Sequence, residues 1–175
     1  REEAEEIIQA LWIKISGLQR GFQNVTLGGM DMNGKDQCND LTMMCLEASR
    51  LVHTDQPSIA LRVHPGMPDE VWEEAMRVLQ TGIGFPALFN DPVIIPTRER
   101  MGASTQEAYN YGIVGCVEPS VPGKEYGHTE GFRINWVKIL ELMLHGGTCP
   151  VTGEYYALQE QHDLEEFQTF EPFYQ

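Results

Sequence analysis

A thiol and a carboxylate stand two residues apart in Gly115-Cys116-Val117-Glu118-Pro119, the most informative stretch of the chain. Pro119 disfavours the helical region for the residue before it, so the backbone at Glu118 is expected to be extended or turn-like. In an extended segment, side chains i and i+2 point to one face with their backbones roughly 6.5–7 Å apart. The sequence therefore predicts that Cys116 and Glu118 reach into one small cavity. Gly115 permits a tight approach to the thiol that a side chain would block.

A cysteine in this setting can act as a nucleophile, a metal ligand or a hydrogen-atom donor. A nucleophilic thiol needs a low pKa, usually supplied by a histidine or a helix N-terminus. The neighbouring carboxylate instead favours the neutral thiol, which counts against thiolate chemistry. A thiyl radical needs only contact with a C–H bond, a dry site and a base, and Glu118 can supply that base. A cysteine hydrolase using His128 stays open as an alternative that predicts activity in air.

The chain resembles the glycyl radical enzymes, the superfamily of pyruvate formate-lyase and the radical diol dehydratases, from about Gly21 to Gly147. Gly-Cys-Val-Glu-Pro matches the dehydratase and lyase branch, whereas pyruvate formate-lyase carries two adjacent cysteines. Further ordered matches are Asn24-Val25-Thr26-Leu27-Gly28-Gly29, Gly34-Lys35-Asp36 with Asn39-Asp40-Leu41-Thr42, and Gly84-Phe85-Pro86 with Asn90-Asp91.

The resemblance implies part of a ten-stranded α/β barrel, with Cys116 on a finger loop at the barrel centre. It implies that Cys116 forms the transient thiyl radical and that Glu118 is the general base. The radical would be stored on a glycine outside this segment and installed by a separate S-adenosylmethionine-dependent iron–sulfur activating enzyme. No cofactor is expected to bind the segment itself. The full-length parent is expected to be a homodimer in an anaerobically living cell.

Two further acidic and aromatic positions correspond to pocket residues of relatives. Glu130 lies 14 residues after Cys116, where the glycerol- and choline-type enzymes carry an aspartate in Gly-Trp-His-Asp. Here the run is Gly127-His128-Thr129-Glu130, which puts glycerol and choline in doubt, and a solvated loop glutamate is an equal alternative. Phe22 matches an aromatic pocket wall of the choline-type lyases, with core packing as its alternative.

Arg133 is the sharper indication of the substrate. Arg133, Asn135 and Lys138 reproduce an Arg-x-Asn-x-x-Lys pattern of pyruvate formate-lyase, whose arginine holds the substrate carboxylate. A guanidinium binds a carboxylate or sulfonate through two parallel hydrogen bonds. An arginine paired with a structural acid is the alternative on a protein this acidic.

Composition excludes several classes of function. The 175 residues are 42% hydrophobic, and no apolar run approaches the length that spans a bilayer. A net charge of −14, from 12 basic and 26 acidic residues, argues against nucleic-acid and anionic membrane partners. The four cysteines and five histidines lack metal-ligand spacing, so we expect no metal site and reduced thiols in a cytoplasm.

Strands alternating with helices predict an α/β fold around a largely parallel sheet. No repeat or linker divides the chain, so residues 1–175 are treated as a single segment of one barrel domain, without the C-terminal glycine radical domain. The chain lacks an initiator methionine, and we expect a piece of a longer protein. Helices are predicted at 2–19, 40–52, 68–80, 104–109, 134–144 and 158–170, and extended segments at 22–27, 58–63, 85–89, 93–95 and 112–117.

The sequence thus predicts the catalytic core of a glycyl radical lyase or dehydratase, inactive as an isolated piece. Cys116 and Glu118 carry the chemistry, and Arg133, Glu130 and Phe22 help to hold a small polar, carboxylate- or sulfonate-bearing substrate. Loss of water, an amine or sulfite, or decarboxylation of an arylacetate, would suit this site. Acyl transfer to coenzyme A, addition to fumarate, and a non-enzymatic degenerate paralogue remain as alternatives.

Overall fold

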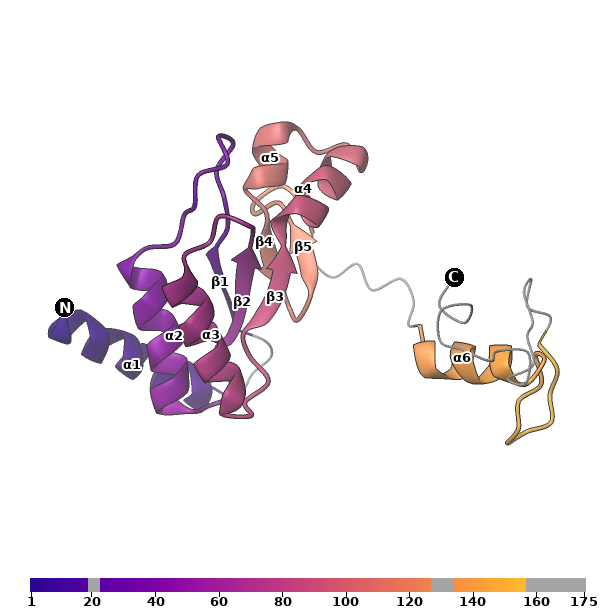
Figure 1. The fold of residues 1–175 in the computed structure, drawn as a ribbon. Helices are drawn as coiled ribbons and strands as arrows, with labels where there is room; N and C mark the ends of the chain where they lie inside the picture. The colour runs from indigo at the N-terminus through magenta and orange to yellow at the C-terminus, as the bar shows by residue number, and fades with distance from the viewer. Residues whose placement is uncertain (19–22, 127–133, 157–175) are drawn as a thin grey trace. The chain divides into compact units, whose positions relative to one another are not determined.

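The computed structural model describes residues 1–18, 23–126 and 134–156. The chain forms two compact units, Arg1–Thr129 and Glu130–Gln175. In the first unit the elements are α1 (Glu2–Gly17), β1 (Asn24–Gly28), α2 (Asp40–Val52), β2 (Ser58–Val63), α3 (Asp69–Gln80), β3 (Ala87–Asn90), α4 (Asp91–Arg100), α5 (Thr105–Tyr109), β4 (Gly112–Val114) and β5 (Glu118–Ser120); the second unit holds α6 (Trp136–Leu144) (Figure 1).

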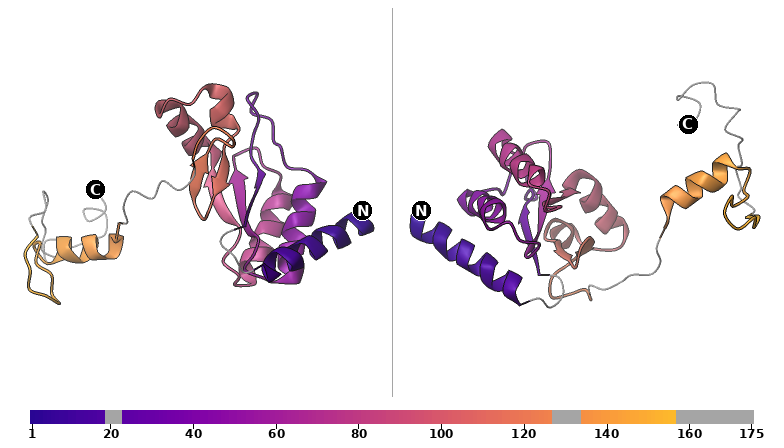
Figure 2. Two further views of the ribbon diagram at one scale, coloured as in Figure 1. Left: turned by 180° about the vertical axis from the view of Figure 1, so that it is seen from behind. Right: turned by 90° about the horizontal axis from the view of Figure 1, so that it is seen from below.

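A parallel three-stranded sheet organises the first unit, in the order β1-β2-β3. The connections through α2 and α3 make two successive βαβ crossovers, which bring those helices to one face of the sheet. Helices α1, α2 and α3 cover that face, and the β4–β5 hairpin with α4 and α5 lies on the other (Figures 1 and 2). The α/β class and the parallel sheet are therefore confirmed.

The central strand β2 shows how the two faces are filled. All six of its residues are buried, as expected for a strand covered on both sides. Ile59, Leu61 and Val63 belong to the larger apolar cluster with α1, α2 and α3. Ala60 belongs to the second cluster, with Phe89, Ile95 and Tyr111. Alternate side chains thus enter two separate cores, and the second core supports the hairpin that carries Cys116.

Most expected elements form where the sequence predicted them. The helix at 40–52 and the strand at 58–63 have the predicted bounds, and α3 begins directly after Pro68. Ser104 and Glu107 form the predicted capping box, with Ser104 N donating to Glu107 Oε2 at 2.9 Å. The first and third strands begin two residues later than predicted, and α6 begins at Trp136.

The prediction of an extended segment at 93–95 is wrong, because these residues lie inside α4. The β-branched run Val93-Ile94-Ile95 is typical of strands. Asp91 and Pro92 instead open a helix, since an acidic residue and a proline both suit a first turn. Only Ile95 of the three is fully buried, against the second core. The predicted helix at 158–170 lies outside the described residues.

The larger core gives a direct stability prediction within α2. Leu46 is 0% exposed in that core, whereas Leu51 on the same helix is 59% exposed. Leu46→Ala should lower the free energy of unfolding by about 2–5 kcal/mol, because it leaves a cavity. Leu51→Ala is the matched control and should change it by less than about 0.5 kcal/mol. Urea unfolding of the full-length protein measures both, and equal shifts would contradict the burial of Leu46.

Candidate functional site

The β4–β5 hairpin presents Cys116 at its tip. The strands are antiparallel, with Val114 paired to Glu118 and Gly112 paired to Ser120, so residues 115–117 form the connecting turn. Gly115 has a φ of +62°, which favours glycine in this turn. Cys116 is exposed within the described part of the chain.

The backbone is turned rather than extended at Cys116, so the alternation that predicted one shared face does not run from Cys116 to Glu118. At Glu118 itself, for which Pro119 predicted an extended or turn-like backbone, the backbone is extended. Glu118 is the first residue of β5, and the hairpin brings its carboxylate back over the turn. The thiol and the carboxylate thus belong to one tight hairpin instead of to a single strand.

The Glu118 carboxylate contacts the backbone of the cysteine turn. Its Oε2 accepts a hydrogen bond from Val117 N at 3.0 Å. A Cβ added at Gly115 would lie 2.8 Å from the same oxygen. The positive φ is therefore the main reason for a glycine at position 115, and the close approach of the Glu118 carboxylate is a second feature of this turn that the sequence did not suggest.

Glu118 also lines a groove of about 460 Å³ between α4 and β5. Its walls are mostly apolar, and its lining residues are Val93, Ile94, Thr97, Arg98, Met101, Val117, Glu118 and Pro119. Arg98 pairs with Glu125, and the pKa of Glu125 is lowered by the Val121 N–H and by that guanidinium. Cys116 is not among the lining residues, so of the two predicted catalytic residues Glu118 alone lines this groove.

The other three cysteines have surroundings unlike those of Cys116, although all four are free thiols. Burial raises the pKa of Cys38 to about 12, with a further contribution from Asp36, and raises the pKa of Cys45 to about 11. Hydrogen bonds from Thr152, and the Lys138 ammonium 3.4 Å from the sulfur, lower the pKa of Cys149 to about 7. No functional role was predicted for Cys149 from the sequence, although Thr152 three residues later was an available signal.

The predicted substrate-binding residues Phe22, Glu130 and Arg133 lie outside the described residues, as does His128. The other members of the Arg-x-Asn-x-x-Lys pattern lie at α6. Asn135 is the N-cap and its Oδ1 accepts from Lys138 N at 3.0 Å. Lys138 forms an ion pair with Glu141. Asn135 and Lys138 therefore both have structural roles at the start of the helix.

Within the described segments, no three His, Cys, Asp or Glu side chains are grouped so as to hold a metal ion. None of the helices in those segments is long and apolar enough to cross a membrane.

The α/β fold corresponds to a known class of proteins. A model of the family "Pyruvate formate lyase-like" matches residues 1–175, and the chain belongs to that family. A solved structure concerned with 1,2-propanediol dehydration in Roseburia inulinivorans has 37% sequence identity and a TM-score of 0.70, over 99% of this chain and 23% of that one. A glycyl radical enzyme of Archaeoglobus fulgidus is also similar, with 28% sequence identity and a TM-score of 0.67, over 95% of this chain and 24% of that one. The predicted membership of the glycyl radical enzymes is therefore confirmed.

Sequence relatives include enzymes of sulfonates. The chain is 39% identical over 137 residues to the (2S)-3-sulfopropanediol dehydratase of Klebsiella oxytoca, covering 77% of this chain and 17% of the relative. It is 30% identical to the isethionate sulfite-lyase of Oleidesulfovibrio alaskensis, covering 99% of this chain and 23% of the relative. The chain thus spans about a fifth of the length of these relatives.

Proposed function

We propose that this chain is the cysteine-bearing core of a glycyl radical lyase or dehydratase, and that it acts within a longer enzyme. The observation that carries the proposal is the Gly115–Pro119 hairpin, which holds a thiol at its tip with a carboxylate folded over the same turn. Membership of the family supports it. In the whole enzyme, the hairpin would be the finger at the centre of a ten-stranded barrel.

The first chemical step belongs to Cys116. A glycyl radical, stored outside this segment and installed by an S-adenosylmethionine-dependent iron–sulfur activating enzyme, takes the hydrogen atom of the Cys116 thiol, which forms a glycine C–H bond and leaves a thiyl radical on sulfur. The Cys116 thiyl radical takes a hydrogen atom from the substrate carbon that bears a hydroxyl group. The sulfur regains its S–H bond, and the substrate becomes a carbon radical.

The second step belongs to Glu118, which removes the proton of that hydroxyl group. The resulting ketyl radical expels the leaving group on the adjacent carbon with its bonding electron pair, and a carbonyl-conjugated radical remains. That radical takes the hydrogen atom back from Cys116, which restores the thiyl radical. Glu118 passes its proton to the departing group, so the substrate is converted to a carbonyl compound and the protonated leaving group without an external oxidant.

The proposed substrate is a small 2-hydroxy compound that carries an anionic group. Arg133 supports this choice because a guanidinium matches the oxygens of a sulfonate or carboxylate. Two relatives named for sulfonate substrates support it as well. Glu130 and Phe22 would complete the pocket, the first by accepting a substrate hydroxyl and the second as an apolar wall. The partners proposed for the whole enzyme are this substrate, its activating enzyme and a second copy of itself in the cytoplasm.

The test is anaerobic activation of the full-length enzyme followed by assay of a vicinal diol, a hydroxy-sulfonate and an arylacetate. We expect an organic radical signal in electron paramagnetic resonance, and release of a carbonyl compound from a hydroxylated substrate. Turnover in air without the activating enzyme would instead support cysteine hydrolase chemistry. A full-length protein that acquires no radical would support the degenerate paralogue.

Arg133 gives a prediction about substrate preference. In Arg133→Gln, the KM for an anionic hydroxy-sulfonate should rise about 10-fold or more, since a charge-assisted hydrogen bond contributes about 1.5–3 kcal/mol. The KM for a neutral vicinal diol should change little. Steady-state kinetics on both substrates give the ratio, and Lys14→Gln on α1 serves as a control for loss of one positive charge. An equal loss on both substrates would place Arg133 in a structural ion pair.

A further inference from the structure

The backbone of the cysteine hairpin is held by side chains that come from the parallel sheet. Thr26 Oγ1 on β1 accepts a hydrogen bond from Ile113 N at 3.0 Å. Asn24 Nδ2, two residues earlier on the same strand, donates to Gly115 O at 3.4 Å. Thr26 Oγ1 also donates to Asn24 Oδ1 at 3.2 Å, which connects the two contacts. Side chains on one face of β1 thus hold alternate residues, Ile113 and Gly115, of the segment that leads to Cys116.

A third contact holds the start of the same segment. Arg62 on β2 donates through Nε and Nη2 to both carboxylate oxygens of Asp91, at 2.9 and 2.8 Å, and through Nη1 to Tyr111 O at 3.3 Å. The Tyr111 hydroxyl donates to Asp91 Oδ1 at 2.6 Å. Burial and Asp91 raise the pKa of Tyr111, so this hydroxyl keeps its proton at neutral pH. Arg62 further lies over the Tyr111 ring at 4.1 Å.

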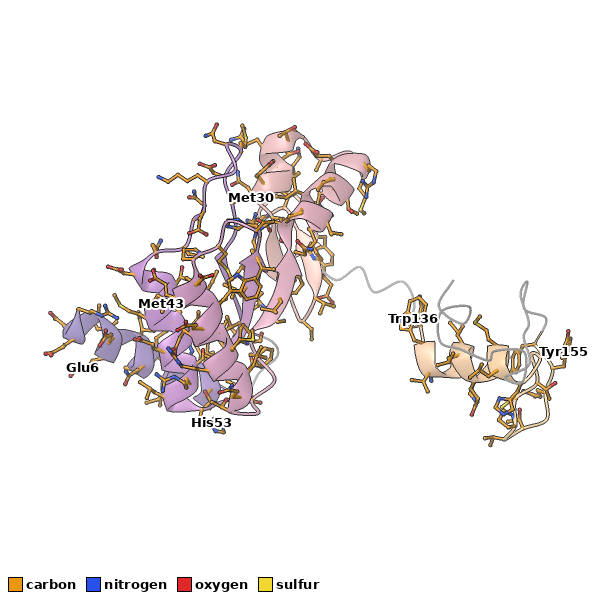
Figure 3. The ribbon with its side chains drawn as sticks, in the orientation of Figure 1. Glu6, Met30, Met43, His53, Trp136 and Tyr155 are labelled. Atoms are coloured by element: carbon orange, nitrogen blue, oxygen red, sulfur yellow. The ribbon has the colours of Figure 1, made fainter. Side chains whose placement is uncertain are left out.

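This third contact is buried, and its charged groups all have hydrogen-bond partners. Asp91, Tyr111 and Arg62 are 0%, 2% and 7% exposed. The remaining lone pair of Asp91 Oδ2 accepts from Met30 N at 2.9 Å, just beyond β1 where Figure 3 labels Met30. Every charge in the group has a partner, and such a fully satisfied network is rigid.

Two glycines, Gly28 at the end of β1 and Gly29 directly after it, lie close to Arg62. A Cβ at Gly29 would lie 2.7 Å from the Arg62 guanidinium, and a Cβ at Gly28 would lie 2.9 Å from Arg62 O. Both glycines have positive φ, of +70° and +93° respectively. Their presence in the sequence therefore follows from the need to bring Arg62 beneath the hairpin as well as from the turn.

We propose that Asn24, Thr26, Arg62, Asp91 and Tyr111 form a clamp of positioning residues that fixes the Cys116 turn for hydrogen-atom transfer. The clamp holds residues 111, 113 and 115 in succession, so its last contact falls one residue before the thiol. Hydrogen-atom transfer is sensitive to the distance between sulfur and carbon, and a displacement of about 1 Å can cost about 100-fold in rate. The proposal rests on the proposed function of Cys116.

Thr26→Val tests the clamp in the activated full-length enzyme. Valine keeps the shape of threonine but cannot accept the Ile113 N–H. We expect kcat per radical to fall about 10- to 100-fold with KM changed less than about threefold. The primary isotope effect on the abstracted substrate hydrogen should rise, because that transfer becomes more rate-limiting. Thr26→Ser retains the hydroxyl and should restore both values.

Two more variants separate the possible outcomes. Thr81→Val removes a hydroxyl bonded to Val78 O at the end of α3, remote from the hairpin, and should leave kcat and the isotope effect unchanged. Asn24→Asp keeps the shape of the asparagine but cannot donate to Gly115 O. It should also lower kcat and raise the isotope effect, and it serves as the test if Thr26→Val folds poorly. Wild-type kcat and isotope effect in Thr26→Val and Asn24→Asp, with Cys116→Ala inactive, would overturn the clamp and leave the proposed function intact. Turnover by Cys116→Ala would overturn the proposed function itself.

Discussion

Replacement of Cys116 by alanine is expected to abolish turnover completely in the activated full-length enzyme. Alanine removes the S–H bond that carries the hydrogen atom away from the substrate and back to it. The change is small and lies at the exposed tip of the hairpin, between the two strands rather than within them. The fold and the stored radical should therefore survive, and radical content by electron paramagnetic resonance should match the wild type while product falls below detection.

Cys149→Ala is the matched control for this experiment. Cys149 is also a free thiol, and its pKa, lowered to about 7 by Thr152 and Lys138, makes it a candidate for chemistry that needs a thiolate. If the reaction proceeds through a thiyl radical at Cys116, Cys149→Ala keeps full turnover. The reverse pattern, with Cys149→Ala inactive and Cys116→Ala active, would indicate nucleophilic chemistry in the second unit and would remove the radical interpretation.

The strands and helices that could be predicted from the sequence are those whose pattern is set by local burial. The strand at 58–63 is covered on both faces and reads as a short apolar run. The helix at 40–52 has Asn39 as its N-cap, and the Asn39 side chain accepts hydrogen bonds from Leu41 N and Thr42 N. Helix α4 was missed because Val93, Ile94 and Ile95 favour strands as isolated residues, whereas the first turn at Asp91 and the packing of Ile95 decide their conformation.

The candidate site divides in the same way. Cys116 and Glu118 could be proposed from two functional groups placed two residues apart and from a family resemblance. Their arrangement could not, because residues 115–117, which begin with a positive φ at Gly115, form a turn that reverses the chain before Glu118. The contacts of the clamp could not be predicted from the sequence either. Thr26 and Ile113 are 87 residues apart, and Arg62 and Tyr111 are 49 residues apart. Such contacts depend on which strands are neighbours, and residue spacing carries no information about that.

Glu118→Gln should lower turnover about 100- to 10,000-fold, the usual contribution of a positioned base. Glutamine has the shape of glutamate and retains an oxygen that can accept from Val117 N, so the contact that now measures 3.0 Å can persist. A loss of activity would then reflect the missing proton acceptor and not a disturbed turn. Thermal stability and radical content of the variant should match those of the wild type.

The reaction step at which Glu118→Gln stops distinguishes a base that acts after hydrogen abstraction from other roles of Glu118. Cys116 is unchanged in Glu118→Gln, so the variant should still form the substrate radical and then fail to expel the leaving group. We expect a substrate-derived radical signal whose hyperfine structure changes when the abstracted position is deuterated. Glu125→Gln removes a nearby carboxylate that pairs with Arg98 and should keep wild-type turnover per folded enzyme. Full turnover by Glu118→Gln would show that another group removes the hydroxyl proton, and the carboxylate over the cysteine turn would then serve only to hold the Val117 N–H.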